Sequence, residues 1–501
     1  MKVLNAQQLR EADAYTITHE PVSAIGLMER AAQQCVNWLL RRDLTTKQVH
    51  IFCGKGGNGG DGLAIARLLA TEGFVLTVYI LEFGKPGTPE FQTNLERLHA
   101  LPVSLHYLQS DNQFPTLSQD AILIDALYGS GLNKPLDGLS ASVVKHLNNS
   151  GAEIISIDLP SGLFADASSK NNVVIRAAHT LTFECYKLAL LVAENAPFTG
   201  DVHVLHIHLY PSFLENINTG FESSDESRIK KIFKPRNRFA HKGTLGHALI
   251  MGGSYGKIGA VVLATSACLR CGAGLVSTYV PGCGYTILQS TAPEAMTITD
   301  PAEKLLTQPC PELDRFSAIG IGPGMGTAKE TAQMLYEVLK KFKKPIVLDA
   351  DALNLLAHEP LLLTQLFENS ILTPHPKEFE RLFGERHTDF DRIDLARKKA
   401  VALKIIIVLK GHHTLIALPD GTAFFNTTGN AGMAKGGSGD VLTGMIAALL
   451  AQGYAPADAA VFGVYLHGLS GDLAAQALSK EAMTSKDLVT FLTQAFLKIS
   501  S

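Results

Sequence analysis

The sequence predicts two α/β domains, the first of them built on a parallel sheet with helices on both faces. A chain of 501 residues exceeds the size at which one core usually keeps growing, so more than one domain is expected. Apolar runs rich in β-branched residues alternate with helical patterns twice, before and after a polar stretch at residues 210–239. The runs are continuously apolar, which is typical of parallel strands buried on both faces.

The strands are expected in two groups. The first group comprises 49–54, 74–81, 121–127, 152–160, 179–184 and 201–209, and the second comprises 247–254, 275–281, 318–324, 345–353, 371–376 and 405–411. Between the two groups, the composition of the sequence changes to polar clusters, a charge run and prolines. We therefore expect domains at 1–213 and 236–501 with a linker at 214–235; the alternative is a surface insertion in one large domain.

Composition favours small-molecule chemistry. A hydrophobic content of 46%, a charged content of 18% and a net charge of -3 are typical of a globular protein. Nucleic acid would require a basic face, which the summed charge does not support. The N-terminus lacks the apolar run of a signal peptide, and no apolar stretch of about 18 residues occurs. We expect a cytoplasmic protein with no nucleic-acid or membrane partner.

The seven cysteines indicate a reducing compartment, because they are few and odd in number. Cys268 and Cys271 form a CxxC inside an apolar helical pattern, without a second pair or a histidine at zinc spacing. Buried thiols are therefore favoured over a metal or redox site.

A glycine-rich loop follows the first strand. The stretch "CGKGGNGGDG" begins at Cys53 and leads into an amphipathic helix. Glycines let backbone N–H groups approach a ligand, and a helix N-terminus favours negative charge, so this is a candidate phosphate cradle. Neither the GxGxxG pattern nor the P-loop ending is present, and a tight turn remains the alternative.

Two further strands of the first group end in polar residues. Asp125 ends one strand and is followed by "YGSGLNKPLDG", and Asp158 and Ser161 end another in "SIDLPSGL". Ligands of open parallel sheets bind beyond the carboxyl ends of the strands, so these loops should meet at one site. Asn58, Asp125 and Ser161 offer one carboxylate among neutral oxygens, which suits a monovalent cation better than Mg²⁺. Helix or turn capping is the alternative for both aspartates.

Four separated stretches of this half resemble the YjeF N-terminal family, the NAD(P)H-hydrate epimerases: "IGLMERAA", "GKGGNGGDG", "DALYGSGLNKPLDG" and "IDLPSGL". The resemblance spans most of residues 1–213. It implies a Rossmann-like three-layer fold that interconverts the R and S forms at C6 of the hydrated nicotinamide ring. Gly57 departs from the family's usual NNGGD, where asparagine stands first.

The resemblance also implies the site residues. Potassium would be held by Asn58, Asp125 and Ser161. The hydrate would contact Gly57, Asn58, Gly59, Gly60, Asp61, Gly129, Ser130, Gly131, Leu132, Asn133, Lys134, Pro135 and Asp158. Epimerisation needs transient loss of water or ring opening, for which a proton-exchanging carboxylate is suited. We favour Asp158 for this role over Asp61.

The second half ends in its clearest motif, "GGSGD", at residues 436–440. Gly436, Gly437, Ser438 and Gly439 lead directly into a helical pattern, so their amides can form an anion hole for a transferring phosphoryl group. Asp440 follows as a candidate general base. Turn geometry alone explains such a run poorly.

Three other strand ends of this half carry candidate ligands. Lys410 and Gly411 follow one strand and could hold the phosphates of a nucleotide, and Gly324 and His375 follow two others. Taken singly, a solvated lysine and a hydrogen-bonded loop histidine are the more economical interpretations.

The second half resembles the ribokinase-like superfamily through "GSGD". Within that superfamily it resembles the YjeF C-terminal family, the ADP/ATP-dependent NAD(P)H-hydrate dehydratases, through "KGTLGHALIMGGSYGKIGA", "GIGPGMG", "TPHPKEF", "VLKGHHT" and "NAGMAKGGSGDVLTG". The resemblance covers nearly all of residues 236–501. It implies phosphoryl transfer to the C6 hydroxyl of the S hydrate, with Asp440 as the base, followed by elimination of phosphate.

For this half the resemblance implies hydrate contacts at Ala260, Gly324, His375 and Asp440, and nucleotide contacts at Lys410, Gly411, His412, His413, Thr414 and Gly439. Mg²⁺ would accompany ADP, the nucleotide that fusion to an epimerase suggests, and AMP would be released. We also expect a homo-oligomer. Two alternatives stay open: a small-molecule kinase of the hydroxymethylpyrimidine or thiazole type, and a non-catalytic nucleotide-binding or protein-binding N-terminal half.

Overall fold

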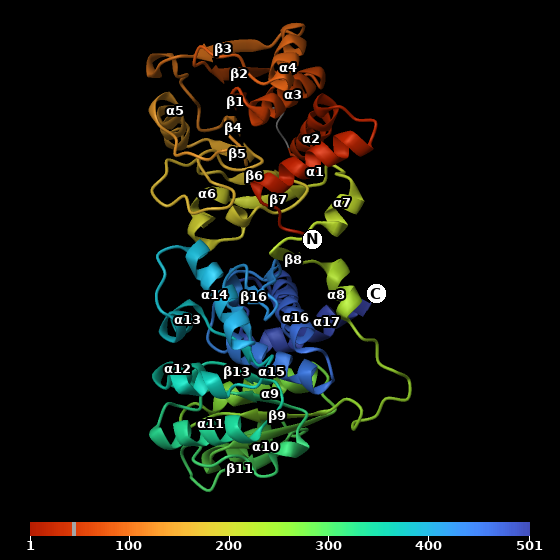
Figure 1. The fold of residues 1–501 in the computed structure, drawn as a ribbon, viewed down its shortest axis with the longest axis vertical. Helices are drawn as coiled ribbons and strands as arrows, with labels where there is room; N and C mark the ends of the chain where they lie inside the picture. The colour runs from red at the N-terminus through yellow and green to blue at the C-terminus, as the bar shows by residue number, and fades with distance from the viewer. Residues whose placement is uncertain (43–46, 501) are drawn as a thin grey trace. The chain divides into compact units, whose positions relative to one another are not determined.

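The computed structural model describes residues 1–42 and 47–500, and Figure 1 shows its helices and strands. Contacts divide the chain into two compact units. The N-terminal unit comprises residues 2–219 with 388–390, and the C-terminal unit comprises residue 1, 220–387 and 391–501. Each unit contains one sheet with helices, so the predicted α/β class is confirmed for both.

The N-terminal unit is built on a seven-stranded parallel sheet in the order β3-β2-β1-β4-β5-β6-β7. The chain order reverses between β1 and β4, as in a Rossmann-like sheet, and ligands bind at such a switch point. The strands are β1 (Val49–Cys53), β2 (Leu76–Leu81), β3 (Ser104–Leu108), β4 (Ile122–Ala126), β5 (Glu153–Ile157), β6 (His179–Phe183) and β7 (Asp201–Leu205).

Helices cover both faces of this sheet. Ile51 of β1 packs with α2, α3 and α4 on one face, whereas its neighbour Phe52 packs with α5 on the other. Successive strand residues point to opposite faces, so burial of both requires a continuously apolar run. The helices are α1 (Ala6–His19), α2 (Ala24–Leu39), α3 (Gly57–Thr71), α4 (Pro89–His99), α5 (Gly138–Asn149), α6 (Ala196–Thr199) and α7 (Pro211–Asn216), with single-turn helices η1 (Asp111–Gln113), η2 (Leu188–Leu190) and η3 (Ala193–Asn195).

The C-terminal unit is built on a ten-stranded sheet in the order β11-β10-β9-β12-β13-β14-β15-β16-β17-β8. Strands from β11 to β15 are parallel, β16 and β17 continue the sheet antiparallel, and β8 pairs parallel with β17. The strands are β8 (Phe221–Ser224), β9 (His247–Met251), β10 (Leu275–Val280), β11 (Met296–Thr299), β12 (Ala318–Ile321), β13 (Ile346–Leu348), β14 (Ile371–Leu372), β15 (Ile406–Leu409), β16 (Leu415–Ala417) and β17 (Ala423–Asn426).

One helix of this unit, α15 (Ser438–Ala451), is buried along its length, from Val441 to Leu449 without interruption. It packs between the sheet and α9, and the apolar core continues into α16 and α17. The other elements are α8 (Glu226–Ile232), α9 (Ile258–Arg270), α10 (Tyr285–Thr291), α11 (Lys329–Lys341), α12 (Asp351–His358), α13 (Pro376–Phe383), α14 (Asp389–Leu403), α16 (Pro456–Leu478) and α17 (Ser485–Ser500), with η4 (Gly282–Gly284), η5 (Leu313–Arg315), η6 (Pro360–Gln365) and η7 (Ala431–Met433).

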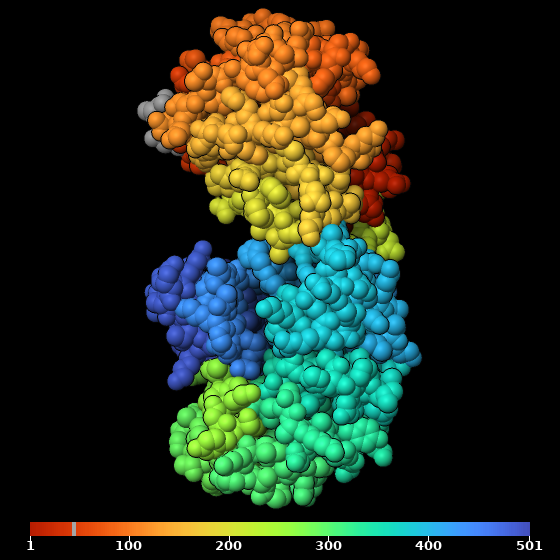
Figure 2. Space-filling view, turned by 90° about the vertical axis from the view of Figure 1, so that its left-hand side faces the viewer, coloured from red at the N-terminus to blue at the C-terminus, as the bar shows by residue number. Residues whose placement is uncertain are grey.

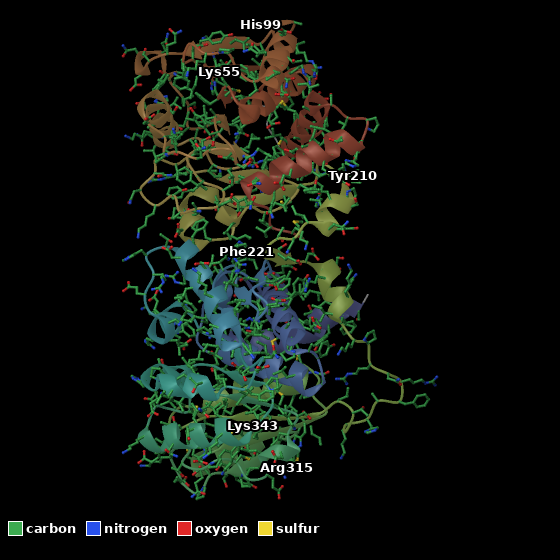
Figure 3. All side chains as sticks on the ribbon, in the orientation of Figure 1. Lys55, His99, Tyr210, Phe221, Arg315 and Lys343 are labelled. Atoms are coloured by element: carbon green, nitrogen blue, oxygen red, sulfur yellow. The ribbon has the colours of Figure 1, made fainter. Side chains whose placement is uncertain are left out.

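The segment expected to be a linker, 214–235, has defined structure. Phe221, labelled in Figure 3, begins β8, and the ladder between β8 and β17 places this strand in the C-terminal sheet. Helix α8 follows and buries Ile229 and Ile232 in the same core. From Gly220 onward the segment is therefore part of the C-terminal unit. Four-residue strands carry too few apolar positions to be recognised in a polar sequence.

Two further features concern the cysteines and the apolar content of the helices. Cys268 lies in α9 and Cys271 directly follows its C-terminus; both are free and buried, as predicted for structural thiols. Across residues 1–42 and 47–500, no helix has the length and apolar content needed to cross a membrane.

Candidate functional site

A first cavity, of about 610 Å³, lies at the carboxyl ends of β1 and β4 in the N-terminal unit. The loop before α3, the loop after β4, and the helices α1 and α2 form its walls. Of the hydrate-binding residues expected there, those that line it are Gly57, Asn58, Asp61, Gly129, Ser130, Gly131, Leu132, Asn133 and Asp158. Gly59, Gly60, Lys134 and Pro135 do not belong to its lining.

Asp158 is fixed in the wall of the first cavity by two donors. Its Oδ1 lies 2.8 Å from Nζ of Lys187, and its Oδ2 accepts a hydrogen bond of 2.8 Å from the backbone N–H of Ser130. Burial alone would raise the pKa of Asp158, but the Lys187 ammonium and the Ser130 amide outweigh it and lower that pKa. The backbone φ of +66° at Asp158 is uncommon outside glycine and is often found at functional sites.

Lys187 was not anticipated from the sequence. Its side chain is only 1% exposed, and Nζ also donates to the Thr182 hydroxyl at 2.8 Å and to the Phe183 carbonyl at 2.9 Å. A buried ammonium with three acceptors uses all of its N–H bonds. The only signal was a lysine within the apolar stretch "CYKLALLV", with no glycine motif beside it.

Gly129 allows two candidate site residues, Asn58 and Asp158, to approach each other. A Cβ at this position would lie 2.7 Å from Oδ2 of Asp158 and 3.3 Å from Cγ of Asn58. Any larger residue would push one of these side chains away, so the glycine predicted as a ligand contact also serves close packing.

The residues expected to hold a cation are only partly assembled. Asp125 is fully buried and accepts hydrogen bonds from the Ser161 hydroxyl at 2.6 Å, the Ser161 N–H at 2.9 Å and the Ser156 hydroxyl at 2.8 Å. Burial raises the pKa of Asp125, although these donors oppose it. Both side-chain polar atoms of Asn58 are buried without a hydrogen-bond partner. An unpartnered buried amide is costly, so Asn58 fits a position that contacts a ligand or an ion.

Four more carboxyl groups line the first cavity, and two of them, Asp61 from α3 and Asp13 from α1, have raised pKa values. Burial and the neighbouring charges of Asp158 and Asp13 raise the pKa of Asp61 well above its ordinary value. Burial raises the pKa of Asp13 to about 6. The cavity therefore combines a carboxylate whose pKa is lowered, Asp158, with two carboxyl groups whose pKa values are raised.

A second cavity, of about 700 Å³, lies at the N-terminus of α15 in the C-terminal unit. In Figure 2 a hollow lies between the cyan and blue surfaces of this unit, the two parts of the chain that supply the lining. Lining residues that the sequence had indicated are His375, Lys410, Gly411, His412, Thr414, Gly436, Ser438 and Gly439.

The glycine turn before α15 is open to the second cavity. No atom lies within 4 Å of the position that a Cβ on Gly436 would take. Gly437 has a φ of +91°, and its Cβ would lie 2.5 Å from Leu263 Cδ1, so this position turns away from the cavity and requires glycine. Unsatisfied amides at a helix N-terminus attract anions, and here they face open space.

A buried ion pair lies beside this turn. Nζ of Lys410 is 2.8 Å from Oδ1 of Asp349, and the Thr443 hydroxyl donates to Oδ2 of Asp349 at 2.9 Å. Although burial opposes it, the Lys410 ammonium lowers the pKa of Asp349. Asp349 stands at the end of a strand, as Asp125 and Asp158 do, but no glycine motif follows it in the sequence.

Asp440 follows the turn on α15. Burial, with the nearby charge of Asp349, raises the pKa of Asp440 to about 7, although Lys410 opposes the shift. A group with a pKa near 7 is suited to act as a general base at neutral pH. Asp440 is not among the residues that line the second cavity.

Ala260 and Gly324 lie together away from the second cavity. A Cβ on Gly324 would be 3.2 Å from that of Ala260. Beside them, Nζ of Lys257 is 3.6 Å from Oδ2 of Asp351, whose charge also acts on Asp440. Of the expected hydrate contacts, Ala260 and Gly324 are therefore apart from the expected nucleotide contacts, whereas His375 lines the second cavity with them.

His375 has two roles. Its Nδ1 accepts the N–H groups of Lys377 at 3.2 Å and Glu378 at 3.4 Å, which caps α13, and the ring also lines the second cavity. His413 is turned elsewhere: its Nδ1 lies 3.3 Å from the Asn426 carbonyl, burial lowers its pKa to about 4, and it does not line the cavity.

His467 of α16 was missed by the sequence reasoning. It lines the second cavity, and its Nε2 lies 2.9 Å from the backbone carbonyl of Ser438. Burial lowers the pKa of His467 to about 4, so the ring is neutral and donates to that carbonyl. A single histidine on an apolar helix face is more often a core residue, and no spacing rule marked this one.

Comparison with known families covers both units. Residues 24–189 match the family described as YjeF-related protein N-terminus, and residues 248–494 match the family described as NAD(P)H-hydrate dehydratase. The two matches include the loops of the first cavity and the glycine turn of the second.

Whole-length relatives carry both parts. A bifunctional NAD(P)H-hydrate repair enzyme of Moorella thermoacetica is 36% identical over 98% of this chain and 96% of that protein. The enzyme of the same description from Escherichia coli K12 is 35% identical over 88% of this chain and 84% of that protein. The crystal structure of a ribokinase-like superfamily protein from Enterococcus faecalis superposes with a TM-score of 0.50 and 28% identity, covering 56% of this chain and 98% of that one.

Proposed function

The chain belongs to the family of bifunctional NAD(P)H-hydrate repair enzymes, and on this premise we propose that each unit carries out one step of the repair. The N-terminal unit epimerises the R and S forms of NAD(P)H hydrate at the first cavity. The C-terminal unit dehydrates the S form with ADP at the second. Together the steps recover both forms, because the first converts the form that the second does not use.

The observation that carries this proposal is the open glycine turn, Gly436 to Gly439, with Asp440 in the next position at the start of α15. Amides that face a cavity can neutralise charge on a transferring phosphoryl group without reorganising. Asp440, with its pKa near 7, takes the proton of the C6 hydroxyl as that oxygen attacks the β-phosphorus of ADP. AMP leaves, and the hydroxyl becomes a phosphate ester.

Elimination completes the step. Hydroxide is a poor leaving group, whereas phosphate departs readily when the lone pair of the ring nitrogen assists it, and loss of a ring proton restores NAD(P)H. We assign the hydrate to Ala260, Gly324 and His375. The nucleotide is assigned to Lys410, Gly411, His412, His413, Thr414 and Gly439; of these, His413 has the weakest support, because it points away from the cavity.

Magnesium is proposed to arrive with the nucleotide. Within the described part of the chain, no three His, Cys, Asp or Glu side chains are grouped so as to hold a metal ion. Mg²⁺ in phosphoryl-transfer enzymes is commonly held by the phosphates with one or two carboxylates, so this arrangement is compatible with a nucleotide-bound ion. When bound, the ion would neutralise phosphate charge.

Potassium is proposed for the first cavity, with Asn58, Asp125 and Ser161 as ligands. The unpartnered amide of Asn58 and the buried carboxyl of Asp125 fit a cation that is largely dehydrated. The Ser161 hydroxyl donates to Asp125 and accepts the backbone N–H of Tyr128 at 2.9 Å, which leaves one lone pair for an ion. When bound, the ion would fix the loop after β4 beside the hydrate.

The test uses an R and S mixture of hydrate with ADP, and follows the return of reduced nicotinamide by its absorbance. The proposal predicts recovery of both forms, with one AMP and one phosphate formed for each NAD(P)H. Recovery of only the S form would remove the epimerase assignment. Consumption of nucleotide on an unrelated alcohol, with no return of NAD(P)H, would instead indicate a small-molecule kinase. Self-association stays a prediction, which sedimentation equilibrium would test.

A further inference from the structure

Among the titratable side chains that line the first cavity, Asp13, Asp61, Asp158 and Lys187 are linked by charge, and Glu90, Tyr128 and Glu184 line it as well. An epimerisation that removes and returns the C6 oxygen needs a group that gives up a proton and takes it back. The hydrogen bonds of these side chains show which of them is free to do so.

The side chains of Asp158 and Lys187 are both held by hydrogen bonds and by their ion pair. The Asp158 oxygens accept the Lys187 ammonium and the Ser130 amide, and neither donor can accept a proton in exchange. The other two N–H groups of Lys187 donate hydrogen bonds to Thr182 and Phe183. A proton placed on Asp158 would leave the buried ammonium without its counterion, which is strongly unfavourable. This pair therefore provides fixed charge and cannot readily carry a proton.

Asp61 is differently placed. It lines the same cavity, and no hydrogen bond or ion pair joins its carboxyl group to the rest of the described chain. Burial and two neighbouring carboxyl groups favour its protonated form. The titratable groups that act on it or share its cavity come from α1, α2, β1, α4 and the loops after β4, β5 and β6: Asp13, Cys35, Cys53, Glu90, Tyr128, Asp158, Glu184 and Lys187.

The position of Asp61 on α3 places it on the same wall of the first cavity as Asn58. Asp61 lies three residues after Asn58, so the two share one face of the helix. The Cβ position of Gly129 lies 3.3 Å from Asn58 Cγ and 2.7 Å from Asp158 Oδ2, so Asn58 and Asp158 meet at this glycine. Asp13 comes from a different wall, on α1.

We propose that Asp61, and not Asp158, exchanges the proton with the C6 oxygen of the hydrate, while the pair of Asp158 and Lys187 supplies fixed charge beside the ring. This inference rests on the proposed epimerisation. The Asp61 carboxyl protonates the C6 hydroxyl as the C6–O bond breaks, and the lone pair of the ring nitrogen forms the C6–N double bond. Water leaves, water adds to the opposite face, and the released proton returns to Asp61. Asp158 stabilises the cationic ring between the two events.

The experiment follows epimerisation alone in the full-length protein. Without nucleotide the dehydration cannot proceed, so purified S hydrate is incubated with the enzyme and the R form is measured by chromatography. Asp61→Asn is expected to slow epimerisation at least about a hundredfold, while hydrate affinity changes only slightly. Asp61→Glu is expected to retain part of the rate with a shifted pH profile. Asp120→Asn, an exposed acid of the same unit, is the matched control and should behave as wild type.

The outcomes separate the inference from its premise. Absence of epimerisation by the wild-type protein would remove the proposed function itself. Epimerisation by Asp61→Asn at the wild-type rate, or its loss in Asp13→Asn with full hydrate binding, would overturn the role of Asp61 and leave the proposed function standing. If Asp61→Asn fails to fold, the pH dependence of epimerisation by Asp61→Glu tests the assignment instead. A pH profile identical to that of wild type would overturn the role of Asp61.

Discussion

Nζ of Lys410 lies 2.8 Å from Oδ1 of Asp349, beside the glycine turn that leads into Asp440. The contact joins the ends of β13 and β15 beneath the start of α15. It places a buried negative charge near Asp440 and explains part of the raised pKa of that group. The electrostatics of the proposed base and the proposed anion hole therefore depend on a residue that the sequence motif does not include.

Asp349→Asn is expected to lower the pKa of Asp440, because a nearby negative charge is removed and Lys410 is released from its partner. Dehydration requires ionised Asp440. The acid limb of the pH–rate profile should therefore lie at lower pH in Asp349→Asn than in wild type. The measurement is kcat/KM for the S hydrate against pH. Asp314→Asn, an exposed acid of the same unit, should leave the profile unchanged. An acid limb that stays near pH 7 in Asp349→Asn would contradict the assignment.

Asp440→Asn is expected to reduce dehydration by about 10²- to 10⁴-fold, the usual contribution of a positioned acid or base. Nucleotide affinity should persist, because the amides of the turn are retained. A substituted protein with at least a tenth of wild-type activity would exclude Asp440 as the base.

The same substitution is expected to stabilise the unliganded protein at alkaline pH. The folded pKa of Asp440, about 7, exceeds the ordinary aspartate value of 3.8, so Asp440 ionises at lower pH in the unfolded chain. The resulting cost to folding is absent below the unfolded pKa, grows as pH rises toward 7 and is complete above it. At about pH 8, Asp440→Asn should raise the free energy of unfolding by roughly 1 kcal/mol or more, with no gain at about pH 3.5. Denaturant titration at both pH values measures this.

Much of the fold was predictable because parallel strands buried on two faces leave long apolar runs. Ile51 and Phe52 serve opposite faces of one strand, and the run at 49–54 was recognised for that reason. β3 at Ser104–Leu108 was not recognised, because it is an edge strand with mostly exposed or partly exposed residues. β8, at Phe221–Ser224, was too short and lay in a polar segment.

The candidate sites were predictable where glycines mark them. The loops with Gly129 and Gly436 were located from sequence, since backbone approach requires glycine. Lys187, Asp349 and His467 were not, because their roles depend on distant contacts with Asp158, Lys410 and Ser438. Such contacts arise only when separate strand ends and helices are brought together by the fold.

Gly436→Ala and Gly437→Ala are expected to differ although they are neighbours. A methyl group at Gly436 enters open space, so folding should be unaffected while nucleotide affinity falls. At Gly437 the positive φ and the contact with Leu263 should destabilise the protein by about 1–3 kcal/mol. Thermal unfolding and nucleotide titration distinguish the two effects. Equal loss of stability in both variants would show that the turn is not open as described.

Removal of potassium is expected to affect only the first cavity. Replacing K⁺ by a bulky organic cation at constant ionic strength should slow epimerisation and lower the melting temperature, because an ion that binds only the folded state stabilises it. Dehydration of purified S hydrate should be unchanged. In Asn58→Ala the response to K⁺ should be lost or strongly weakened. An undiminished K⁺ response in Asn58→Ala would show that the amide is not a ligand.

The fate of the C6 oxygen tests the phosphoryl-transfer account most directly. S hydrate carrying heavy oxygen in its C6 hydroxyl is incubated with ADP and the full-length protein for a single turnover. The heavy-oxygen content of the released phosphate and AMP is then measured by mass spectrometry. Transfer to the hydroxyl followed by elimination predicts one heavy oxygen in each released phosphate and none in AMP. Unlabelled phosphate, with the heavy oxygen in water, would show that the hydroxyl leaves without being phosphorylated and would contradict the account.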